Sequence, residues 1–167
     1  NAPKQGSITV NGIHTFSAEA RLRIGYMPER PYFHEHLTGD QLLYYMGTLA
    51  GMSKSEISDR IPGVLDLVGM SHARYIELRK YSKGMLQRIG IAQSILHDPE
   101  LLVLDEPMSG LDPLGRKEIR DLILSMADQG KTVFFTSHLI QDVEAICHSV
   151  AILKKGELFK SNHLSNV

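Results

Sequence analysis

The sequence is short of cysteine, of net charge and of long apolar runs. Cys147 is the single cysteine among 167 residues, which excludes a disulfide framework within the chain and is typical of a reducing compartment. The formal net charge of −1 gives no indication of a surface that binds nucleic acid. No apolar run approaches the roughly 18 residues of a membrane span. We therefore expect any membrane role to come through a partner, and we expect no nucleic-acid partner.

The composition is that of an ordinary globular domain, with 43% apolar and 22% charged residues. Residues 6–16 read GSITVNGIHTF, in which β-branched residues flank an Asn-Gly pair and predict a hairpin. Residues 23–28, RIGYMP, predict a short strand that ends at a proline. The first part of the sequence, residues 6–28, is therefore predicted to form β-structure.

A helical pattern follows. Apolar residues at helical spacing predict a helix over residues 40–51, with Thr38 as its N-cap. A second apolar stripe runs from residue 57 to residue 68, but Pro62 interrupts it, and an interior proline costs about 3 kcal/mol. We expect either a kink or a new helix that starts at Pro62. Ser82 is the predicted N-cap of a third helix.

Apolar strands then alternate with helices. The pattern predicts strands at residues 101–105 and 132–137, helices at 114–128 and 140–147, and two closing strands at 150–153 and 157–160. Such alternation indicates a parallel sheet that helices cover. The predicted fold class is therefore α/β, with an all-helical insert over residues 37–99 between pieces of the core.

Two adjacent carboxylates, Asp105 and Glu106, follow the apolar strand LLVL. The last residues of a buried parallel strand reach the carboxyl edge of the sheet, where ligands bind in open α/β folds. There Asp105 suits Mg²⁺ bound through water, and Glu106 suits a water that attacks a phosphate. The alternative is a strand that ends in a solvated acidic turn. His138 follows the next predicted strand, and its imidazole suits contact with a γ-phosphate at the same edge.

Together these residues resemble the ATP-binding cassette family, the nucleotide-binding subunits of ABC transporters. LLVLDE matches the Walker B motif, SGLD at residues 109–112 matches the D-loop, TSH at 136–138 carries the switch histidine, and YSKGM at 81–85 matches the signature motif. The resemblance covers nearly the whole chain. It implies ATP and Mg²⁺ as cofactors. It also implies a P-loop NTPase-like parallel sheet core with an all-helical ABC subdomain and a short N-terminal antiparallel β piece.

The resemblance also assigns site residues. Glu106 and His138 would be catalytic, and Asp105 would hold the metal. Glu29 stands at the place of the Q-loop glutamine, where it would contact nucleotide and metal. In the family two cassettes pack head to tail, so each signature loop contacts the nucleotide of the opposite subunit. The other nucleotide-contacting residues that the resemblance implies are Tyr81, Ser82, Lys83, Gly84, Met85 and Asp112.

Four of these residues depart from the family pattern. Tyr81, Lys83 and Met85 replace the usual leucine, glycine and glutamine of the signature. Such signatures resemble those of the ABC-2-type exporter branch. Glu29 replaces a glutamine, and its charge changes the local electrostatics, so its role as a ligand stays open.

The sequence has no G-x-x-x-x-G-K-[ST] phosphate loop. In the family this loop lies upstream of the segment matching APKQGSITVNG, so we expect a truncated piece with an incomplete core. GKT at residues 130–132 does not supply the loop, because Ser125 stands where the motif needs glycine and a strand follows. We expect a helix-to-strand turn there. We also expect this fragment to lack ATPase activity and to self-associate through its uncovered sheet.

The implied organisation has three parts: residues 1–36 with the β piece and Q-loop strand, residues 37–99 as the helical signature subdomain, and residues 100–167 as a RecA-like core. The implied function is an ATP-hydrolysing subunit that drives transport. Its partners would be a transmembrane permease and a second nucleotide-binding subunit, on the cytoplasmic face of the membrane. The alternative is a cassette ATPase of DNA maintenance or of the ribosome, although the sequence has neither a long coiled coil nor a basic linker.

Overall fold

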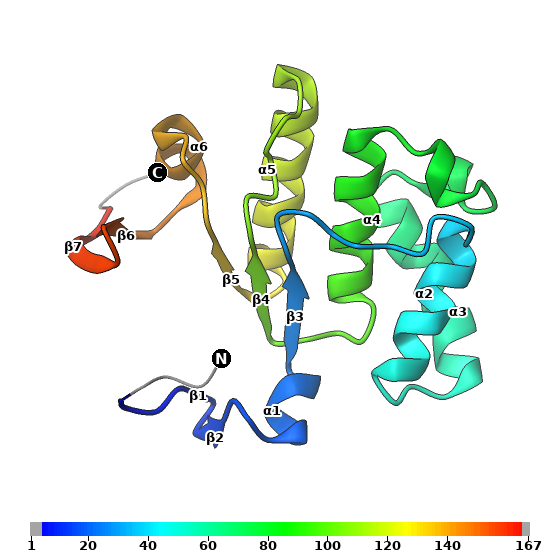
Figure 1. Cartoon of the computed structure of the whole chain (residues 1–167), viewed down its shortest axis with the longest axis horizontal. Helices are drawn as coiled ribbons and strands as arrows, with labels where there is room; N and C mark the ends of the chain where they lie inside the picture. The colour runs from blue at the N-terminus through cyan, green and yellow to red at the C-terminus, as the bar shows by residue number, and fades with distance from the viewer. Residues whose placement is uncertain (1–4, 165–167) are drawn as a thin grey trace. The chain divides into compact units, whose positions relative to one another are not determined.

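The computed structural model of the protein describes residues 5–164, and Figure 1 shows its helices and strands. Residues 2–4 of the segment APKQGSITVNG lie outside the described residues. The chain divides into two compact units, Asn1–Thr136 and Ser137–Val167. Each unit is described by itself below.

The predicted N-terminal hairpin is confirmed. Strands β1 (Thr9–Val10) and β2 (Ile13–His14) pair antiparallel. Asn11 and Gly12 connect them with φ values of 49° and 78°, the left-handed conformation that a two-residue hairpin turn requires of both residues. A short helix that the sequence did not predict, α1 (Ala18–Leu22), follows the hairpin.

A three-stranded parallel sheet forms the centre of the first unit (Figure 1). The register pairs Met27 with Leu104 and Leu104 with Phe135, so the three strands end at one level. This confirms the predicted parallel sheet, and the residues that follow each strand meet at its carboxyl edge. In spatial order the strands are β3 (Ile24–Met27), β4 (Leu101–Leu104) and β5 (Thr132–Phe135).

The segment between β3 and β4 is helical, as predicted. Thr38 caps the first helix with a capping box: its hydroxyl accepts from the Gln41 N–H at 3.2 Å, and the Gln41 side chain accepts from the Thr38 N–H at 3.0 Å. The helices are α2 (Gly39–Leu49), α3 (Lys54–Leu67) and α4 (Lys83–Ile95), with 3₁₀ turns at Ser71–Ala73 and Leu78–Lys80.

Pro62 lies inside α3, so the alternative of a new helix at Pro62 is wrong. The helix runs without a break through the proline, whose ring is exposed. Ile57, Ile61 and Leu65 are almost completely buried along one side of α3. Packing of this apolar side stabilises the helix against the hydrogen bond that Pro62 removes.

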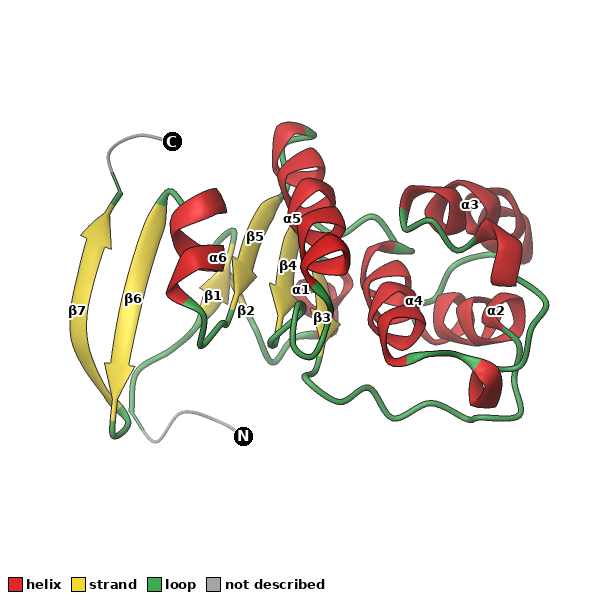
Figure 2. Cartoon of the chain, turned by 90° about the horizontal axis from the view of Figure 1, so that it is seen from above, coloured by secondary structure: helices red, strands yellow, loops and turns green. Residues whose placement is uncertain are grey.

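Helices α4 and α5 (Pro113–Asp128) cover one face of the sheet (Figures 1 and 2). Met27, Leu102 and Leu104 are fully buried on this side. The sheet and α4 approach each other closely at Gly25, where a Cβ would clash with the Ser94 carbonyl of α4 and would lie 2.7 Å from Leu102 Cδ2 of β4. Only glycine fits this position without a shift of the core.

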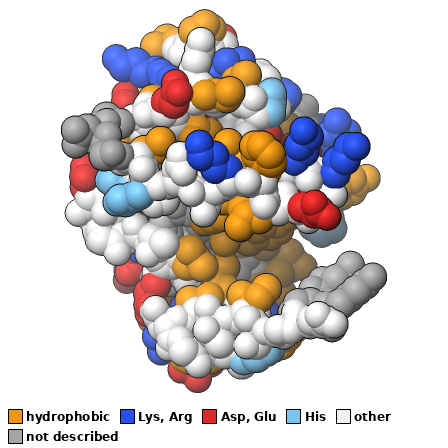
Figure 3. Space-filling view, turned by 90° about the vertical axis from the view of Figure 1, so that its left-hand side faces the viewer, with side chains coloured by type: hydrophobic (Ala, Val, Ile, Leu, Met, Phe, Trp, Pro, Cys, Tyr) orange, Lys and Arg blue, Asp and Glu red, His pale blue; other side chains and the backbone are white. Residues whose placement is uncertain are grey.

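The opposite face of the sheet carries Tyr26, Val103 and Phe134, which are neighbours across the three strands. Tyr26 is 53% exposed and Phe134 is 58% exposed. Figure 3 shows hydrophobic side chains, in orange, at the surface of one side of the molecule. Among the described residues, this sheet therefore presents a partly uncovered apolar face, which we name the open face (Tyr26, Val103 and Phe134).

The second unit begins with α6 (Ile140–Ile146) and ends in an antiparallel hairpin of β6 (Ser149–Lys154) and β7 (Glu157–His163), seen in Figure 2. Lys155 and Gly156 form its turn with φ values of 52° and 83°. Both strands are longer than the sequence predicted. None of the described helices, in either unit, has the length and apolar character needed to cross a membrane.

Candidate active site

Asp105 and Glu106 lie directly after β4, at the carboxyl edge of the sheet, as the sequence predicts. The parallel ladder continues one residue past the strands. The Asp105 N–H donates to the Met27 carbonyl at 2.8 Å, and the Thr136 N–H donates to the Leu104 carbonyl at 3.0 Å. Asp105 is therefore held between the ends of β3 and β5, and both acidic residues are partly buried.

The hydroxyl of Thr136 joins the two acidic residues. It donates to Asp105 Oδ1 at 2.6 Å and accepts from the backbone N–H of Glu106 at 2.9 Å. A short hydrogen bond from a hydroxyl to a carboxylate is strong and orients the carboxylate. In the motif TSH only the histidine was predicted to be functional, so Thr136 is a functional candidate that the sequence pattern did not identify. The available signal was a hydroxyl residue directly after the strand that neighbours LLVL.

Glu106 has a left-handed backbone, with φ at 48°. A residue other than glycine pays on the order of 1 to 2 kcal/mol for this conformation. The hydrogen bond to Thr136 and one from the Ser109 N–H to the Glu106 carbonyl, at 3.0 Å, hold the turn. The chain thus turns sharply directly after the carboxylate pair, and strain of this kind is typical of functional sites.

The signature loop, residues 81–85, ends at the start of α4. Ser82 caps the helix as predicted, because its Oγ accepts from the Met85 N–H at 3.3 Å. Tyr81 differs from the four residues after it: it is 8% exposed, and its hydroxyl donates to the Ala73 carbonyl at 2.8 Å. Burial raises the pKa of Tyr81. The Tyr81 side chain therefore packs into the helical segment, whereas the following residues are exposed or partly exposed.

The D-loop, residues 109–112, lies beside the signature loop. A Cβ on Gly84 would lie 3.5 Å from Leu111 Cδ2, a normal contact distance. Asp112 caps α5, because its Oδ1 accepts from the Gly115 N–H at 2.7 Å. Arg116 Nε donates to the Leu111 carbonyl at 3.1 Å. Two loops far apart in the sequence are thereby brought together within the first unit.

Glu29 and His138 occupy different units. Glu29 is exposed and lies two residues after the end of β3. The chain leaves the sheet there, at the edge that carries Asp105. His138 is an exposed residue of the second unit, close to the start of α6. The assignment of either residue to nucleotide or metal stays a prediction.

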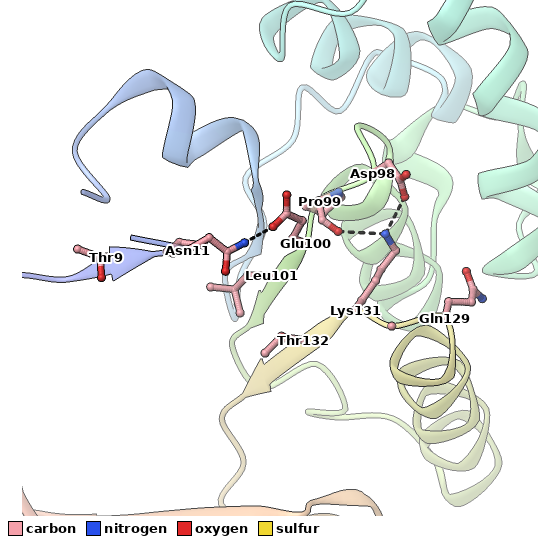
Figure 4. Close-up of a pocket in the computed structure, with 11 residues that line it drawn as sticks. Thr9, Asn11, Asp98, Pro99, Glu100, Leu101, Gln129, Lys131 and Thr132 are labelled. Carbon is pink, nitrogen blue, oxygen red and sulfur yellow. Dashed lines mark hydrogen bonds and ion pairs between the residues drawn. The ribbon is translucent and has the colours of Figure 1, made fainter. Parts of the chain in front are cut away.

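A pocket of about 620 Å³ lies at the opposite, amino edge of the sheet (Figure 4) and is lined by residues 9–11, 98–101 and 129–132. In it the Lys131 ammonium donates to Asp98 Oδ1 at 2.6 Å and to the Pro99 carbonyl at 3.0 Å. The bond from Lys131 lowers the pKa of Asp98. Gly130 has φ at 85°, and Thr132 begins β5. GKT is therefore the predicted helix-to-strand turn, far along the sheet from the carboxylates.

A parallel sheet with a carboxylate pair at its carboxyl edge, and with a helical insert that carries the signature loop, is the architecture of an ATP-binding cassette. The family model described as "ABC transporter" matches residues 1–109, and the chain belongs to that family. An ABC transporter ATP-binding protein of Synechocystis sp. is 51% identical over 151 residues, 89% of this chain and 43% of that protein. The bacitracin transport ATP-binding protein BcrA of Bacillus licheniformis is 38% identical, over 95% of this chain and 52% of that protein.

A solved structure of an ATP-binding subunit of an ABC transporter matches with a TM-score of 0.84 and 28% identity, over 97% of this chain and 68% of that one. These comparisons confirm the predicted family and the α/β fold class. The chain spans about half the length of the curated relatives it matches.

Proposed function

We propose that this chain is part of an ATP-hydrolysing subunit that drives transport through a membrane permease. The observation that carries the proposal is the hydrogen-bonded set of Asp105, Glu106 and Thr136 at the carboxyl edge of the sheet. This set holds two neighbouring acidic residues where open α/β sheets bind their ligands. Relatives named as transport ATP-binding proteins support the link to transport.

Asp105 fits a magnesium ion, because its carboxylate offers hard oxygen donors at the end of a rigid strand. Among residues 5–164, no group of three or more His, Cys, Asp or Glu side chains is arranged to hold a metal ion. A sparse protein donor set agrees with Mg²⁺, which keeps several waters and binds phosphate oxygens. Thr136 would orient Asp105 toward the ion, with Glu29 as the second proposed ligand. When bound, the ion would neutralise charge on the phosphates.

Glu106 is the proposed residue that orients the attacking water and accepts its proton. His138 is proposed to contact the γ-phosphate, where a donor stabilises the charge that develops during transfer. The hydrogen bonds to the Glu106 N–H and carbonyl support its role, because they fix the turn that presents its side chain.

The signature loop is proposed to contact ATP on a second nucleotide-binding subunit. Ser82, Lys83, Gly84 and Met85 lie at the accessible start of α4, whose N-terminal dipole favours an anion. Tyr81 would support this loop from the buried side. Asp112 would lie at the same subunit interface, because its loop neighbours the signature loop.

The loop after Glu29 is the proposed contact with the permease. Tyr32 is fully exposed in it, which suits an apolar anchor for a helix of a membrane subunit. Such a contact would place the protein on the cytoplasmic face of the membrane. The departures in the signature favour an exporter. We retain the proposed division into residues 1–36, 37–99 and 100–167 for these roles.

The chain by itself is proposed to be inactive and to self-associate. Its sequence has no phosphate loop, so a triphosphate lacks the lysine and backbone amides that bind it in P-loop enzymes. The open face of the sheet supports self-association, because it exposes aromatic side chains to water.

The test compares ATP hydrolysis by this chain with hydrolysis by a form extended upstream to include a phosphate loop. We expect hydrolysis only in the extended form, and we expect Glu106→Gln to reduce it by at least about a hundredfold. Glu144→Gln, at an exposed glutamate of α6, is the matched control and leaves the rate unchanged. Equal rates for Glu106→Gln and the unmodified extended form would refute the proposed function.

A further inference from the structure

The side chain of Lys83 lies across Gly110 of the D-loop. A Cβ built on Gly110 would lie 2.7 Å from Lys83 Cε and 3.1 Å from Cδ, and closer still to the ammonium nitrogen. Gly110 also has φ at 69°, a conformation that favours glycine. The absence of a side chain at Gly110 is therefore what lets the end of the lysine pack directly on the D-loop backbone.

Lys83 is placed against the local preference of its helix. It is the first residue of α4, and no acidic residue occupies the first turn. A cation at this end opposes the helix dipole and is disfavoured there. A residue that breaks a local rule is expected to be compensated by another contact or by function. The contact with Gly110 is the compensation that the structure offers.

We propose that Lys83 is a positioning residue that holds the D-loop against the signature loop of the same chain, through packing of its side chain on Gly110. The inference rests on the proposed function, since it concerns how two loops of that site are presented together. The Leu111 side chain, next in sequence, reaches to within normal contact distance of the Gly84 position. The contact of Lys83 with Gly110 and the contact of Leu111 with Gly84 together join the two loops.

Packing and charge predict different behaviour for substitutions of Lys83. If the aliphatic stem of the side chain (Cδ and Cε) positions the D-loop, methionine can substitute for lysine, because its unbranched apolar side chain reaches about as far as that stem. If Lys83 acts by its charge on a phosphate, methionine behaves like alanine and weakens nucleotide affinity. The inference commits to the first behaviour.

The first test uses this chain without nucleotide. The Leu111 N–H donates to the Met108 carbonyl at 3.3 Å, so its hydrogen exchange reports opening of the D-loop. We expect Lys83→Ala to accelerate exchange of the Leu111 amide at least about fivefold. Lys83→Met and the control Lys117→Met, at an exposed lysine of α5, leave exchange unchanged. Unchanged exchange in Lys83→Ala overturns the inference.

The second test measures kcat and KM for ATP in the form extended upstream. Misplaced catalytic groups lower the rate more than the affinity. We expect Lys83→Ala to lower kcat about tenfold and to change KM less than about twofold. A raised KM with an unchanged kcat in Lys83→Ala, or an unchanged kcat alone, overturns the inference. Loss of hydrolysis in Glu106→Gln in the same series shows separately that the proposed function stands.

Discussion

The Thr136 hydroxyl connects Asp105 and Glu106 through two hydrogen bonds, one donated to Asp105 Oδ1 at 2.6 Å and one accepted from the Glu106 N–H at 2.9 Å. Thr136 lies 31 residues after Asp105 in the chain and directly follows the neighbouring strand β5. One side chain therefore fixes both the orientation of a carboxylate and the main chain of the strained residue beside it.

Replacing Thr136 by valine removes both hydrogen bonds and keeps the shape of the side chain. We expect Thr136→Val to reduce the free energy of unfolding of this chain by about 1 to 2 kcal/mol, measured by urea titration. In the form extended upstream, we expect it to lower ATP hydrolysis about tenfold or more, because Asp105 and Glu106 lose their alignment. Thr136→Ser keeps the hydroxyl and is the control. Equal activity of the valine and serine variants would contradict this role.

A second prediction concerns Tyr81, the first residue of the signature loop. Its buried hydroxyl donates to the Ala73 carbonyl at 2.8 Å, and a Cβ on Gly39 would lie 2.5 Å from that hydroxyl oxygen. We expect Tyr81→Phe to reduce the free energy of unfolding by about 1 kcal/mol, since the Ala73 carbonyl loses its donor. Tyr75→Phe, at a tyrosine that is 72% exposed, is the matched control. Equal midpoints in urea for the two variants would show that the Tyr81 hydroxyl bond contributes nothing.

Sequence reasoning succeeded where one segment determines its own structure. The N-caps Thr38 and Ser82 were predicted because a hydroxyl stands directly before an apolar helical pattern, and both side chains accept the expected backbone bond. The position of Asp105 and Glu106 followed from the apolar strand before them.

Sequence reasoning failed where the determinant lies elsewhere in the chain. Pro62 left open a kink or a new helix, and no new helix starts there because packing of the rest of α3 outweighs the missing hydrogen bond; the kink stays a prediction. Helix α1 is five residues long, too short to give a periodic signal. The pairs Thr136–Asp105 and Lys83–Gly110 depend on side-chain contacts between distant segments, which no local pattern encodes.

A third prediction concerns the pH dependence of stability. His97 is partly buried, and Nε2 lies 3.2 Å from the Ile24 carbonyl. Burial lowers the pKa of His97 from its usual value of 6.5. The positive charges of Arg60 and Lys131 act in the same direction, whereas Asp98 and the carbonyl oppose them. The unfolded chain therefore takes up a proton at His97 at a higher pH than the folded chain does.

The sign of the effect follows from that difference. The stability due to neutral His97 is complete above about pH 6.5 and decreases as the pH falls from there toward the lower folded-state pKa. We expect the free energy of unfolding to fall between about pH 7 and pH 5, and His97→Gln to flatten this decrease. Urea titrations across this pH range measure the free energy of unfolding. His148→Gln, at an exposed histidine, is the control. A curve for His97→Gln parallel to that of the unmodified chain would rule out this origin.

The last prediction concerns the open face of the sheet. Tyr26 and Phe134 are both more than half exposed, at 53% and 58%, and lie one strand apart on either side of Val103. Contiguous apolar surface of this kind is uncommon on a monomer and favours association. Because each copy presents the same face, a symmetric pair would cover both at once. We expect this chain to sediment above its 18.7 kDa monomer mass at micromolar concentration.

Substitutions on this face distinguish association through the open face from non-specific association. Phe134→Lys puts a charge on the open face, where desolvation on association disfavours it, so we expect sedimentation to shift toward the monomer. Tyr75→Lys changes an exposed aromatic residue of the helical segment and leaves the association unchanged. If both lysine variants associate as the unmodified chain does, the open face is not the interface. If the unmodified chain sediments as a monomer at every concentration, the open face does not drive association, and Tyr26 and Phe134 remain exposed to water in the monomer.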